Sequence, residues 1–222
     1  MADDHAGDWA RVRREYADVG LREVDAGVDP YALLERWLAD ALAAFDAGAL
    51  AEPNAMALAT VGSDGAPSVR TVLLKGLHEG GLCFYTNHDS RKGQDLAAEP
   101  RCAATLLWHE LQRQVRVEGR AYRLPDEVSD AYFASRPRPA QLGAWASPQS
   151  RTVADRAALE QAYAEVEERF ANRPEVPRPP HWGGWRVVPE RMEFWHGRPG
   201  RMHDRLRFTR TGTDWHRERL AP

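Results

Sequence analysis

The stretch NAMALATVGSDGAPSVRTVLLKGLHEGGLCFYTN, residues 54–87, alternates β-branched and aliphatic residues with short polar breaks. Its segments GSDGAP and HEGG have the glycine content and the length of hairpin turns. The stretch therefore predicts three strands joined by two turns. Two more strand-like runs, RCAATLLWHE and RQVRVEGRAYRL, follow after a short helical segment. Meandering strands at this spacing predict an antiparallel barrel rather than a parallel β-α-β sheet.

Helical patterns flank these strands, so the predicted fold class is mainly β with flanking helices (α+β). DPYALLERWLADALAAF has Asp29 as N-cap and Pro30 in the first turn of an amphipathic helix. Its apolar face is expected to contain Leu34, Trp37, Leu38, Ala41, Leu42 and Phe45. Further helices are predicted in SRKGQDLAAEP, DEVSDAYFASRP and TVADRAALEQAYAEVEERFANRP. WRVVPERMEFWHG and RLRFTRTGTDWHRERLAP predict a final pair of strands.

The chain has 222 residues, of which 43% are hydrophobic and 28% charged, enough for one sizeable core. We expect one domain over residues 29–222, preceded by a polar arm, residues 1–28, with a short helix around Trp9 to Tyr16. A net charge of -3 gives no overall attraction to nucleic acid or to an anionic membrane.

The cysteine pattern and the lack of targeting signals predict a cytoplasmic protein. Cys83 and Cys102 lie in apolar runs without CxxC spacing, which predicts buried thiols in a reducing compartment. No apolar run approaches the roughly 20 residues that span a bilayer, and the N-terminal segment has no apolar signal core.

The segment YTNHDSRKG carries hydroxyls and cations at the start of a predicted helix: Thr86, Ser90, Arg91 and Lys92. Free N–H groups, hydroxyls and cations at a helix N-terminus suit a phosphate. The alternative is a solvated turn with an N-cap. No GxGxxG or GxxxxGK[ST] motif is present, so Rossmann or P-loop nucleotide binding is not supported.

Lysine is rare in this chain, since Lys75 and Lys92 are the two lysines among 30 basic residues. A lysine is a compact point charge for a phosphate, although Lys75 at the end of SVRTVLLK could also extend its ammonium into solvent. Arg70 and Lys75 are five residues apart, and such residues point to opposite faces of a regular strand. The two cations should therefore serve different anions.

Two later segments collect further candidates. YFASRPRPAQLGAWASPQSR contains Tyr132, Arg136, Arg138, Gln149 and Ser150, where an arginine near a helix end could simply interact with the helix dipole. MEFWHGRPGRMHDR places Glu193, Trp195, Arg201, His203, Asp204 and Arg205 around a turn. The imidazole could act as acid or base, or donate to an anion. No group has metal-ligand spacing, and the absence of a nucleophile beside HDR argues against Ser-His-Asp hydrolysis.

Taken together, the segments resemble the pyridoxine (pyridoxamine) 5'-phosphate oxidase family. The resemblance is collinear over nearly the whole chain and rests on RREY, RTVLLK, FYTN, SRK, RQV, YFASRPR, GAWAS, WGGWRV, EFWHGRPGRMHDR and RLAP. It implies an antiparallel FMN-binding split β-barrel and a homodimer with FMN in clefts at the subunit interface. It also implies the residues that would form the site.

The cofactor-binding residues implied by the resemblance are Arg70, Lys75, Tyr85, Thr86, Arg91, Lys92, Gln114, Gln149, Ser150, Trp195 and Arg205. Arg70 and Lys92 would hold the FMN phosphate. The substrate-binding residues are Arg13, Tyr16, Lys75, Tyr132, Arg136, Arg201 and His203. Lys75 belongs to both sets and would bind the substrate phosphate. Arg201 and His203 would lie over the pyridine ring as the catalytic residues. Residues 13–16 would cover the substrate.

The implied reaction is oxidation of pyridoxine or pyridoxamine 5'-phosphate to pyridoxal 5'-phosphate, with O2 reduced to H2O2 and ammonia released from the amine. One departure is Ala140, where the family pattern usually has a serine for the substrate phosphate. Loss of that donor would cost about 1 kcal/mol. Two alternatives stay open: a related oxidase of phenazine-biosynthesis type with a non-phosphorylated substrate, and a flavin- or pyridoxal-phosphate-binding protein without turnover.

Overall fold

The structure is a computed structural model that describes residues 15–222. Arg13 and most of the predicted helix around Trp9 to Tyr16 lie outside the described residues. The described chain divides into two compact units, each built from separate stretches of sequence. Unit 1 contains the residues up to Pro53 together with Leu107–Val115 and Met192–Pro222. Unit 2 contains Asn54–Leu106 and Arg116–Arg191. A single domain over residues 29–222 stays a prediction.

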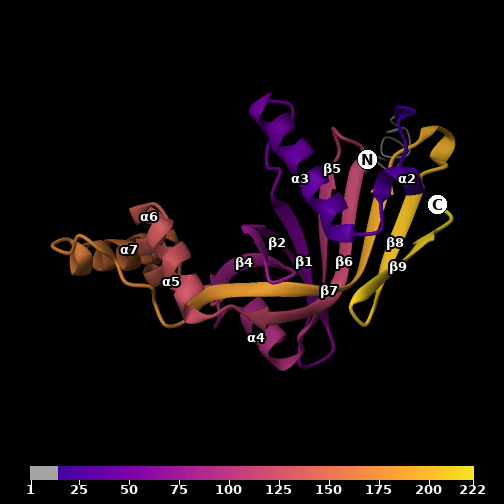
Figure 1. The fold of residues 1–222 in the computed structure, drawn as a ribbon. Helices are drawn as coiled ribbons and strands as arrows, with labels where there is room; N and C mark the ends of the chain where they lie inside the picture. The colour runs from indigo at the N-terminus through magenta and orange to yellow at the C-terminus, as the bar shows by residue number, and fades with distance from the viewer. Residues whose placement is uncertain (1–14) are drawn as a thin grey trace, which may run out of the picture. The chain divides into compact units, whose positions relative to one another are not determined.

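The strands of the described residues form one nine-stranded sheet (Figure 1). Its path runs β2-β1-β5-β6-β7-β4-β3, with β8 paired to β7 and β9 paired to β8. The pairs β1–β2, β1–β5, β3–β4, β4–β7 and β8–β9 are antiparallel. The strands are β1 (Ala55–Val61), β2 (Pro67–Leu73), β3 (Gly76–His78), β4 (Gly81–Asn87), β5 (Arg101–Trp108), β6 (Arg113–Arg123), β7 (Trp182–His196), β8 (Asp204–Thr211) and β9 (Asp214–Arg219).

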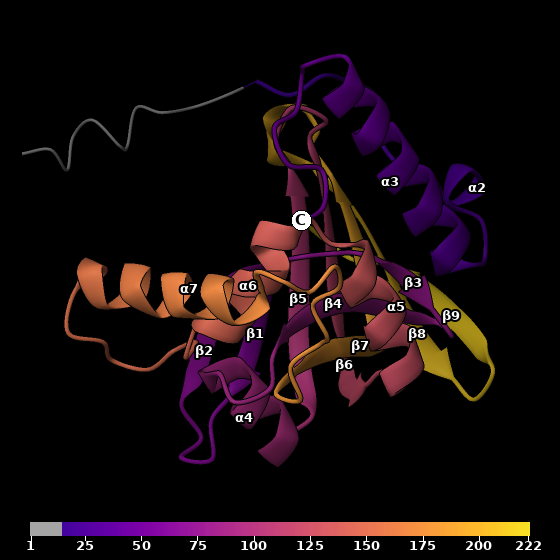
Figure 2. The same ribbon diagram turned by 90° about the vertical axis from the view of Figure 1, so that its left-hand side faces the viewer.

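The helices confirm the expected mainly β fold with flanking helices. In unit 1 they are α2 (Glu23–Ala26), α3 (Pro30–Asp46) and the 3-10 turn η1 (Pro199–Arg201). In unit 2 they are α4 (Arg91–Ala98), α5 (Asp126–Ser135), α6 (Arg138–Ala146) and α7 (Arg156–Phe170). Figure 2 shows α4 beside the end of the β1–β2 hairpin, and α6 alongside α7. No helix of the described residues is long and apolar enough to cross a membrane.

The prediction for residues 54–87 is confirmed for the two hairpins, but it is wrong in the number of strands, which is four rather than three. GSDGAP joins the antiparallel pair β1 and β2, and HEGG joins β3 and β4. However, β2 ends at Leu73 and the short β3 starts only at Gly76, whose φ of +139° suits a glycine. Lys75 lies in this break, with its N–H bound to the carbonyl of Cys83. The alternation of side chains along a regular strand therefore does not extend from Arg70 to Lys75, and it does not support the prediction that these two cations point to opposite faces.

The predicted helix at residues 30–46 exists, but its buried face is shifted. Asp29 caps α3 by accepting a hydrogen bond from the N–H of Tyr31. Leu33, Leu34, Trp37 and Ala41 are buried, whereas Leu42 and Phe45 of the expected face are exposed. Trp37 meets the ring of Phe194 edge-on at 5.3 Å, so α3 covers the core of unit 1.

Helix α2, helix α6 and the β8–β9 hairpin were not predicted from the sequence. Helix α6 follows α5 directly after Pro137, and Gln141 joins the two by donating to the carbonyls of Phe133 and Ala134 at 2.9 and 3.3 Å. The final predicted strand is in fact the hairpin β8–β9. Its turn contains Gly212 at φ +65°, a conformation that an L-residue rarely adopts.

Candidate functional site

A pocket of unit 2 gathers most of the predicted phosphate-binding residues. It measures about 530 Å³, and we call it the lysine pocket because both lysines of the chain line it. Its predicted members are Lys75, Tyr85, Thr86, Lys92, Tyr132, Arg136 and Gln149. Members that were not predicted as site residues are Thr71, Val72, Leu73, Ser135, Pro137, Ala140 and Trp182. Residues from β2, β4, α4, α5 and α6 thus converge on one cavity.

Three nearly parallel rings form the aromatic wall of the lysine pocket. Tyr85 stacks on Tyr132 at 3.8 Å, and Trp182 lies 5.4 Å from Tyr85. The guanidinium of Arg136 lies 4.7 Å above the Trp182 ring. Trp182 was missed as a site residue, although the aromatic WGGW segment was a signal. Such a wall can accept a flat ring beside a bound anion.

The ammonium of Lys92 is surrounded by side-chain oxygens in the lysine pocket. Its Nζ donates to Gln149 Oε1 at 2.8 Å and to Thr86 Oγ1 at 3.0 Å. Ser90, the N-cap of α4, lies 3.4 Å from the same nitrogen. Burial, and then the nearby Arg70, lower the pKa of Lys92 to about 8. An anion beside this ammonium would relieve both effects.

Arg70 does not line the lysine pocket. Its guanidinium donates to Thr60 Oγ1 at 2.7 Å and to Ser68 Oγ at 2.9 Å. Asp95 of α4 lies 3.6 Å away and also accepts from Thr60 at 2.6 Å. Burial lowers the pKa of Arg70. The structure thus gives Arg70 a set of internal partners that the sequence did not reveal.

Arg136 and Lys75 differ from Arg70 because no carboxylate is paired with either among the described residues. The Nη1 atom of Arg136 is buried and has no hydrogen-bond partner. Burial lowers the pKa of this guanidinium. Leaving a charged donor unpaired is costly, so Arg136 suits an anionic ligand.

The loop before α4 is held by His88. The Trp185 indole N–H donates to His88 Nδ1 at 3.1 Å. The backbone N–H of His88 donates to the backbone carbonyl of His181. Burial, and then Arg123 and Arg178, lower the pKa of His88 to about 4. His88 is therefore neutral at physiological pH and remains an acceptor, which fixes the loop that precedes Lys92.

Three more predicted cofactor residues do not line the lysine pocket. Arg91 is the exposed first residue of α4. Ser150 is exposed and has a left-handed backbone with φ +69°. Gln114, in β6, belongs to unit 1.

In unit 1, three rings surround the predicted catalytic turn. Tyr16 meets Trp195 at 5.8 Å and His203 at 5.5 Å, both edge-on, and Trp195 lies 4.8 Å from His203. A Cβ at Gly197 would come within 2.7 Å of the Tyr16 ring. Gln112 connects the same parts, accepting from the N–H of Ala17 and, through its carbonyl, from Gly197. Tyr16 therefore lies against the turn that carries Arg201 and His203.

The hydrogen bonds define the proton position on His203. The N–H of Arg198 donates to His203 Nδ1 at 3.1 Å, so the neutral ring carries its proton on Nε2. Burial, and then the charge of Arg201, lower the pKa of His203. At neutral pH the imidazole is therefore a hydrogen-bond donor through Nε2.

The arginines around this turn fall into two kinds. Arg205 is bound to Glu193 at 2.8 Å, and Arg219 to Glu23 at 2.6 Å. Asp204 connects the turn with the N-terminal segment, because it accepts from the Leu21 N–H and pairs with Arg219. Arg201 is exposed, has φ +62°, and shows no hydrogen bond or ion pair within residues 15–222.

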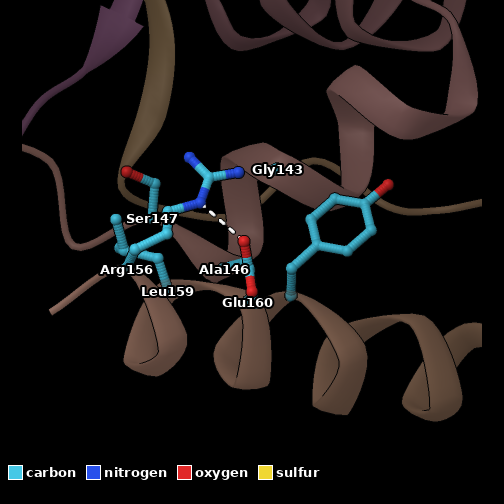
Figure 3. Close-up of a pocket in the computed structure, with 7 residues that line it drawn as sticks. Gly143, Ala146, Ser147, Arg156, Leu159 and Glu160 are labelled. Atoms are coloured by element: carbon cyan, nitrogen blue, oxygen red, sulfur yellow. Dashed lines mark hydrogen bonds and ion pairs between the residues drawn. The ribbon is translucent and has the colours of Figure 1, made fainter.

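A further pocket of about 530 Å³ lies between α6 and α7 and contains none of the predicted site residues. Figure 3 shows its labelled lining residues, with the Arg156 guanidinium paired to Glu160 at 2.8 Å. Because its single cation is neutralised, it offers less to an anion than the lysine pocket. Within the described residues, no cluster of three or more His, Cys, Asp or Glu could hold a metal ion. Cys83 and Cys102 are buried free thiols.

Two family models match the chain. The model described as pyridoxamine 5'-phosphate oxidase matches residues 42–170, and that for the pyridoxine 5'-phosphate oxidase C-terminal dimerisation region matches residues 182–222. The chain belongs to the pyridoxamine 5'-phosphate oxidase family. Membership in this oxidase family supports oxidoreductase chemistry.

Curated relatives of the family cover almost the whole chain. A pyridoxine/pyridoxamine 5'-phosphate oxidase from Rubrobacter xylanophilus is 56% identical over 215 residues, which is 97% of each chain. One from Synechocystis sp. is 52% identical over 213 residues, covering 96% of this chain and 97% of the relative.

A solved structure of the family confirms the split-barrel fold. PhzG from Burkholderia lata, crystallised with tetrahydrophenazine-1-carboxylic acid, superposes with a TM-score of 0.83 at 36% identity. The match covers 92% of this chain and 99% of PhzG. The antiparallel sheet with flanking helices is thus shared with a protein that was crystallised with a phenazine acid, so family membership alone leaves the substrate open.

Proposed function

We propose that the protein is an FMN-dependent oxidase that converts pyridoxine and pyridoxamine 5'-phosphate to pyridoxal 5'-phosphate, with O2 as electron acceptor. The observation that carries the proposal is the lysine pocket, in which the predicted substrate-phosphate residues Lys75, Tyr132 and Arg136 lie together. Two of them are cations without a carboxylate partner among the described residues, so a dianionic phosphate would complete them.

The donor set of the same pocket also suits FMN. Lys92 is a buried cation whose hydrogen-bond partners are neutral oxygens, and Thr86 and Gln149 supply further polar groups. Arg70 and Arg91 add positive charge close by, since Arg91 is one of the charges acting on Arg70. When bound, FMN would supply the hydride acceptor for oxidation at C4' and the redox chemistry that reduces O2 to H2O2.

The chain's own residues bind and orient the substrate. Lys75, Tyr132 and Arg136 hold the phosphate, which fixes one end of the pyridine ring. His203 donates a hydrogen bond from Nε2 to a ring substituent, because its Nδ1 is occupied by the Arg198 N–H. Arg201, which no described carboxylate neutralises, lies over the pyridine ring and holds C4' in position for hydride transfer. Tyr16, with its ring against Trp195 and His203, shields the substrate from water.

We infer that the protein acts as a homodimer in the cytoplasm and serves vitamin B6 metabolism. The match of residues 182–222 to a dimerisation region supports the dimer, and two buried free thiols suit a reducing compartment.

A second candidate is a phenazine-type oxidase with a non-phosphorylated tricyclic substrate. The similarity to PhzG favours it. That activity gives no role to Lys75, Tyr132 and Arg136 as a set. A binding protein without turnover is the third possibility, and it gives no role to Arg201.

Oxygen uptake by the purified, FMN-loaded protein tests these possibilities. We expect uptake with pyridoxine 5'-phosphate and pyridoxamine 5'-phosphate, equimolar H2O2, and ammonia from the amine alone. Pyridoxine and pyridoxamine without the phosphate serve as matched controls and should react far more slowly. Equal rates with and without the phosphate, or turnover of a reduced phenazine carboxylic acid alone, would refute the proposal.

A further inference from the structure

A second pocket of unit 2 shares Arg136 with the lysine pocket. It measures about 820 Å³ and is lined by residues of α5, of the start of α6 and of the segment 173–178. Its charged lining consists of four arginines and two carboxylates: Arg136, Arg138, Arg173, Arg178, Asp130 and Glu175. We call it the arginine pocket. None of its residues apart from Arg136 has a role in the proposed function.

The arginines of this pocket are not all neutralised. Arg178 is, because it pairs with Asp126 at 2.7 Å and with Asp130 at 2.5 Å. Arg138 instead donates to two carbonyl groups, those of Phe170 and Pro174, at 2.7 and 3.4 Å. These carbonyls accept hydrogen bonds from some of the five N–H groups of Arg138, but they are neutral and do not compensate its positive charge.

Arg173 also keeps its charge. Its guanidinium lies 5.9 Å from the Phe170 ring, and within residues 15–222 no carboxylate is paired with it. Glu175 is the one lining carboxylate not engaged by Arg178. The pocket therefore has a net positive charge, which suits an anion.

Arg136 stands in the wall between the two pockets. Its backbone is fixed, since Gln141 holds the preceding carbonyls of α5 and the Arg136 N–H binds the Phe133 carbonyl. Its guanidinium is less constrained: it rests on the Trp182 and Phe133 rings, and its Nη1 is buried without a hydrogen-bond partner. A small rotation of a side chain with spare donors costs little, so either pocket can use it.

We propose that the arginine pocket is a second anion site, which binds a phosphate group and competes with the lysine pocket for Arg136. A phosphate there accepts hydrogen bonds from Arg136, Arg138 and Arg173, whose planar guanidinium groups match its oxygens. The effect on catalysis rests on the proposed function: a phosphate held in the arginine pocket draws Arg136 away from the substrate phosphate and raises KM.

Inhibition by inorganic phosphate tests the competition. Oxidation of pyridoxine 5'-phosphate by the FMN-loaded protein is measured at increasing inorganic phosphate concentration, in the wild type and in Arg173→Gln. We expect the variant to require about tenfold more phosphate for the same inhibition, with KM in phosphate-free buffer unchanged. Unchanged inhibition in Arg173→Gln would mean that phosphate acts in the lysine pocket alone, and would overturn the proposal.

Arg169→Gln is the matched control. Arg169 also stacks on the Phe170 ring, at 5.1 Å, but does not line the arginine pocket. It should behave like the wild type. If both variants weaken inhibition equally, loss of packing on Phe170 is the cause and the anion site is refuted.

A binding measurement separates this site from the proposed activity. FMN-loaded Lys75→Gln protein, in which the lysine pocket has lost a phosphate contact, is titrated calorimetrically with inorganic phosphate. Binding that persists, and that disappears in Lys75→Gln/Arg173→Gln, supports the site even if no B6 phosphate is oxidised. No binding by Lys75→Gln, or equal binding by the double variant, would remove the site and leave the proposed oxidase activity intact.

Discussion

The lysine pocket of unit 2 and the turn around residues 195–205 of unit 1 both concentrate positive charge, but their cations have different partners. In the pocket, Lys75, Lys92 and Arg136 have no carboxylate partner within the described residues. Around the turn, three arginines are paired with acidic residues: Arg198 with Asp18, Arg205 with Glu193, and Arg219 with Glu23 and Asp204. Ion-paired cations hold the chain together, whereas unpaired cations are available to a ligand.

The same distinction applies inside unit 1. Arg201 is the arginine of the turn that stays unpaired within residues 15–222, and it also has a left-handed backbone. A side chain held in a strained turn without a protein partner suggests a ligand partner. The comparison therefore predicts which arginines matter for activity and which for stability.

The largest expected effect follows from removing the unpaired arginine. Arg201→Met should lower turnover about 10²-fold, because the pyridine ring is no longer held in position for hydride transfer, while FMN stays bound. Steady-state kinetics and flavin absorbance measure the two quantities. Arg207→Met, which removes an arginine paired with Glu218, is the control and should keep its activity. Wild-type turnover in Arg201→Met would remove Arg201 from the catalytic assignment.

A smaller effect is expected from changing the shape of a cation in the lysine pocket. Lys75→Arg keeps the charge but replaces a compact ammonium with a bulky fork, so KM for the phosphorylated substrate should rise about tenfold. FMN affinity, measured by quenching of flavin fluorescence, should change little. A larger loss of flavin than of substrate affinity would show that Lys75 serves the cofactor.

The pKa of Lys92 predicts a pH dependence of flavin binding. Without an anion the ammonium loses its proton above about pH 8, whereas a bound phosphate keeps it protonated. Binding above pH 8 therefore takes up a proton, and affinity should fall with rising pH by up to about tenfold per pH unit. Fluorescence titrations between pH 7 and 9.5 measure this slope. Lys92→Arg should flatten it, since arginine stays charged; an equal slope in the variant would assign the titration to another group.

The smallest effect is expected from a paired arginine. Arg219→Met removes contacts with Glu23, Asp204 and the carbonyl of Leu21. Because such surface networks contribute little, we expect a loss of about 1 kcal/mol, or about 2–4 °C in Tm, by thermal unfolding. Turnover per folded molecule should stay near that of the wild type. A collapse of turnover with Tm unchanged would show that paired arginines also act in catalysis.

Local sequence signals predicted the regular elements well. Asp29 and Ser90 cap the helices that they were expected to cap, and glycine-rich turns close the β1–β2 and β3–β4 hairpins. These features depend on neighbouring residues, which a sequence displays directly. The family could be predicted for the same reason, because its motifs are short and occur in the same order along this chain.

The errors arose where distant parts of the chain decide the structure. The break at Lys75 depends on hydrogen bonds from residues 74 and 75 to Asn54 and Cys83. Which side chains of α3 are exposed depends on its tertiary contacts, as the exposed Leu42 and Phe45 show. Trp182 is distant in sequence from Tyr85 and Tyr132, and only the folded structure brings the three rings together. Arg70 could not be given its partner Asp95 from sequence. The predicted roles of the site residues stay predictions.

The bond from the Trp185 indole to His88 gives the protein an optical signal of its own. A protonated imidazole quenches a neighbouring indole, whereas the neutral ring that His88 keeps down to about pH 4 does not. Emission from Trp185 should therefore dim when His88 is protonated while the two rings stay in contact. Acid titration of the intrinsic fluorescence can follow this loop without a label. His88→Leu is the control, and its fluorescence should show no change near pH 4.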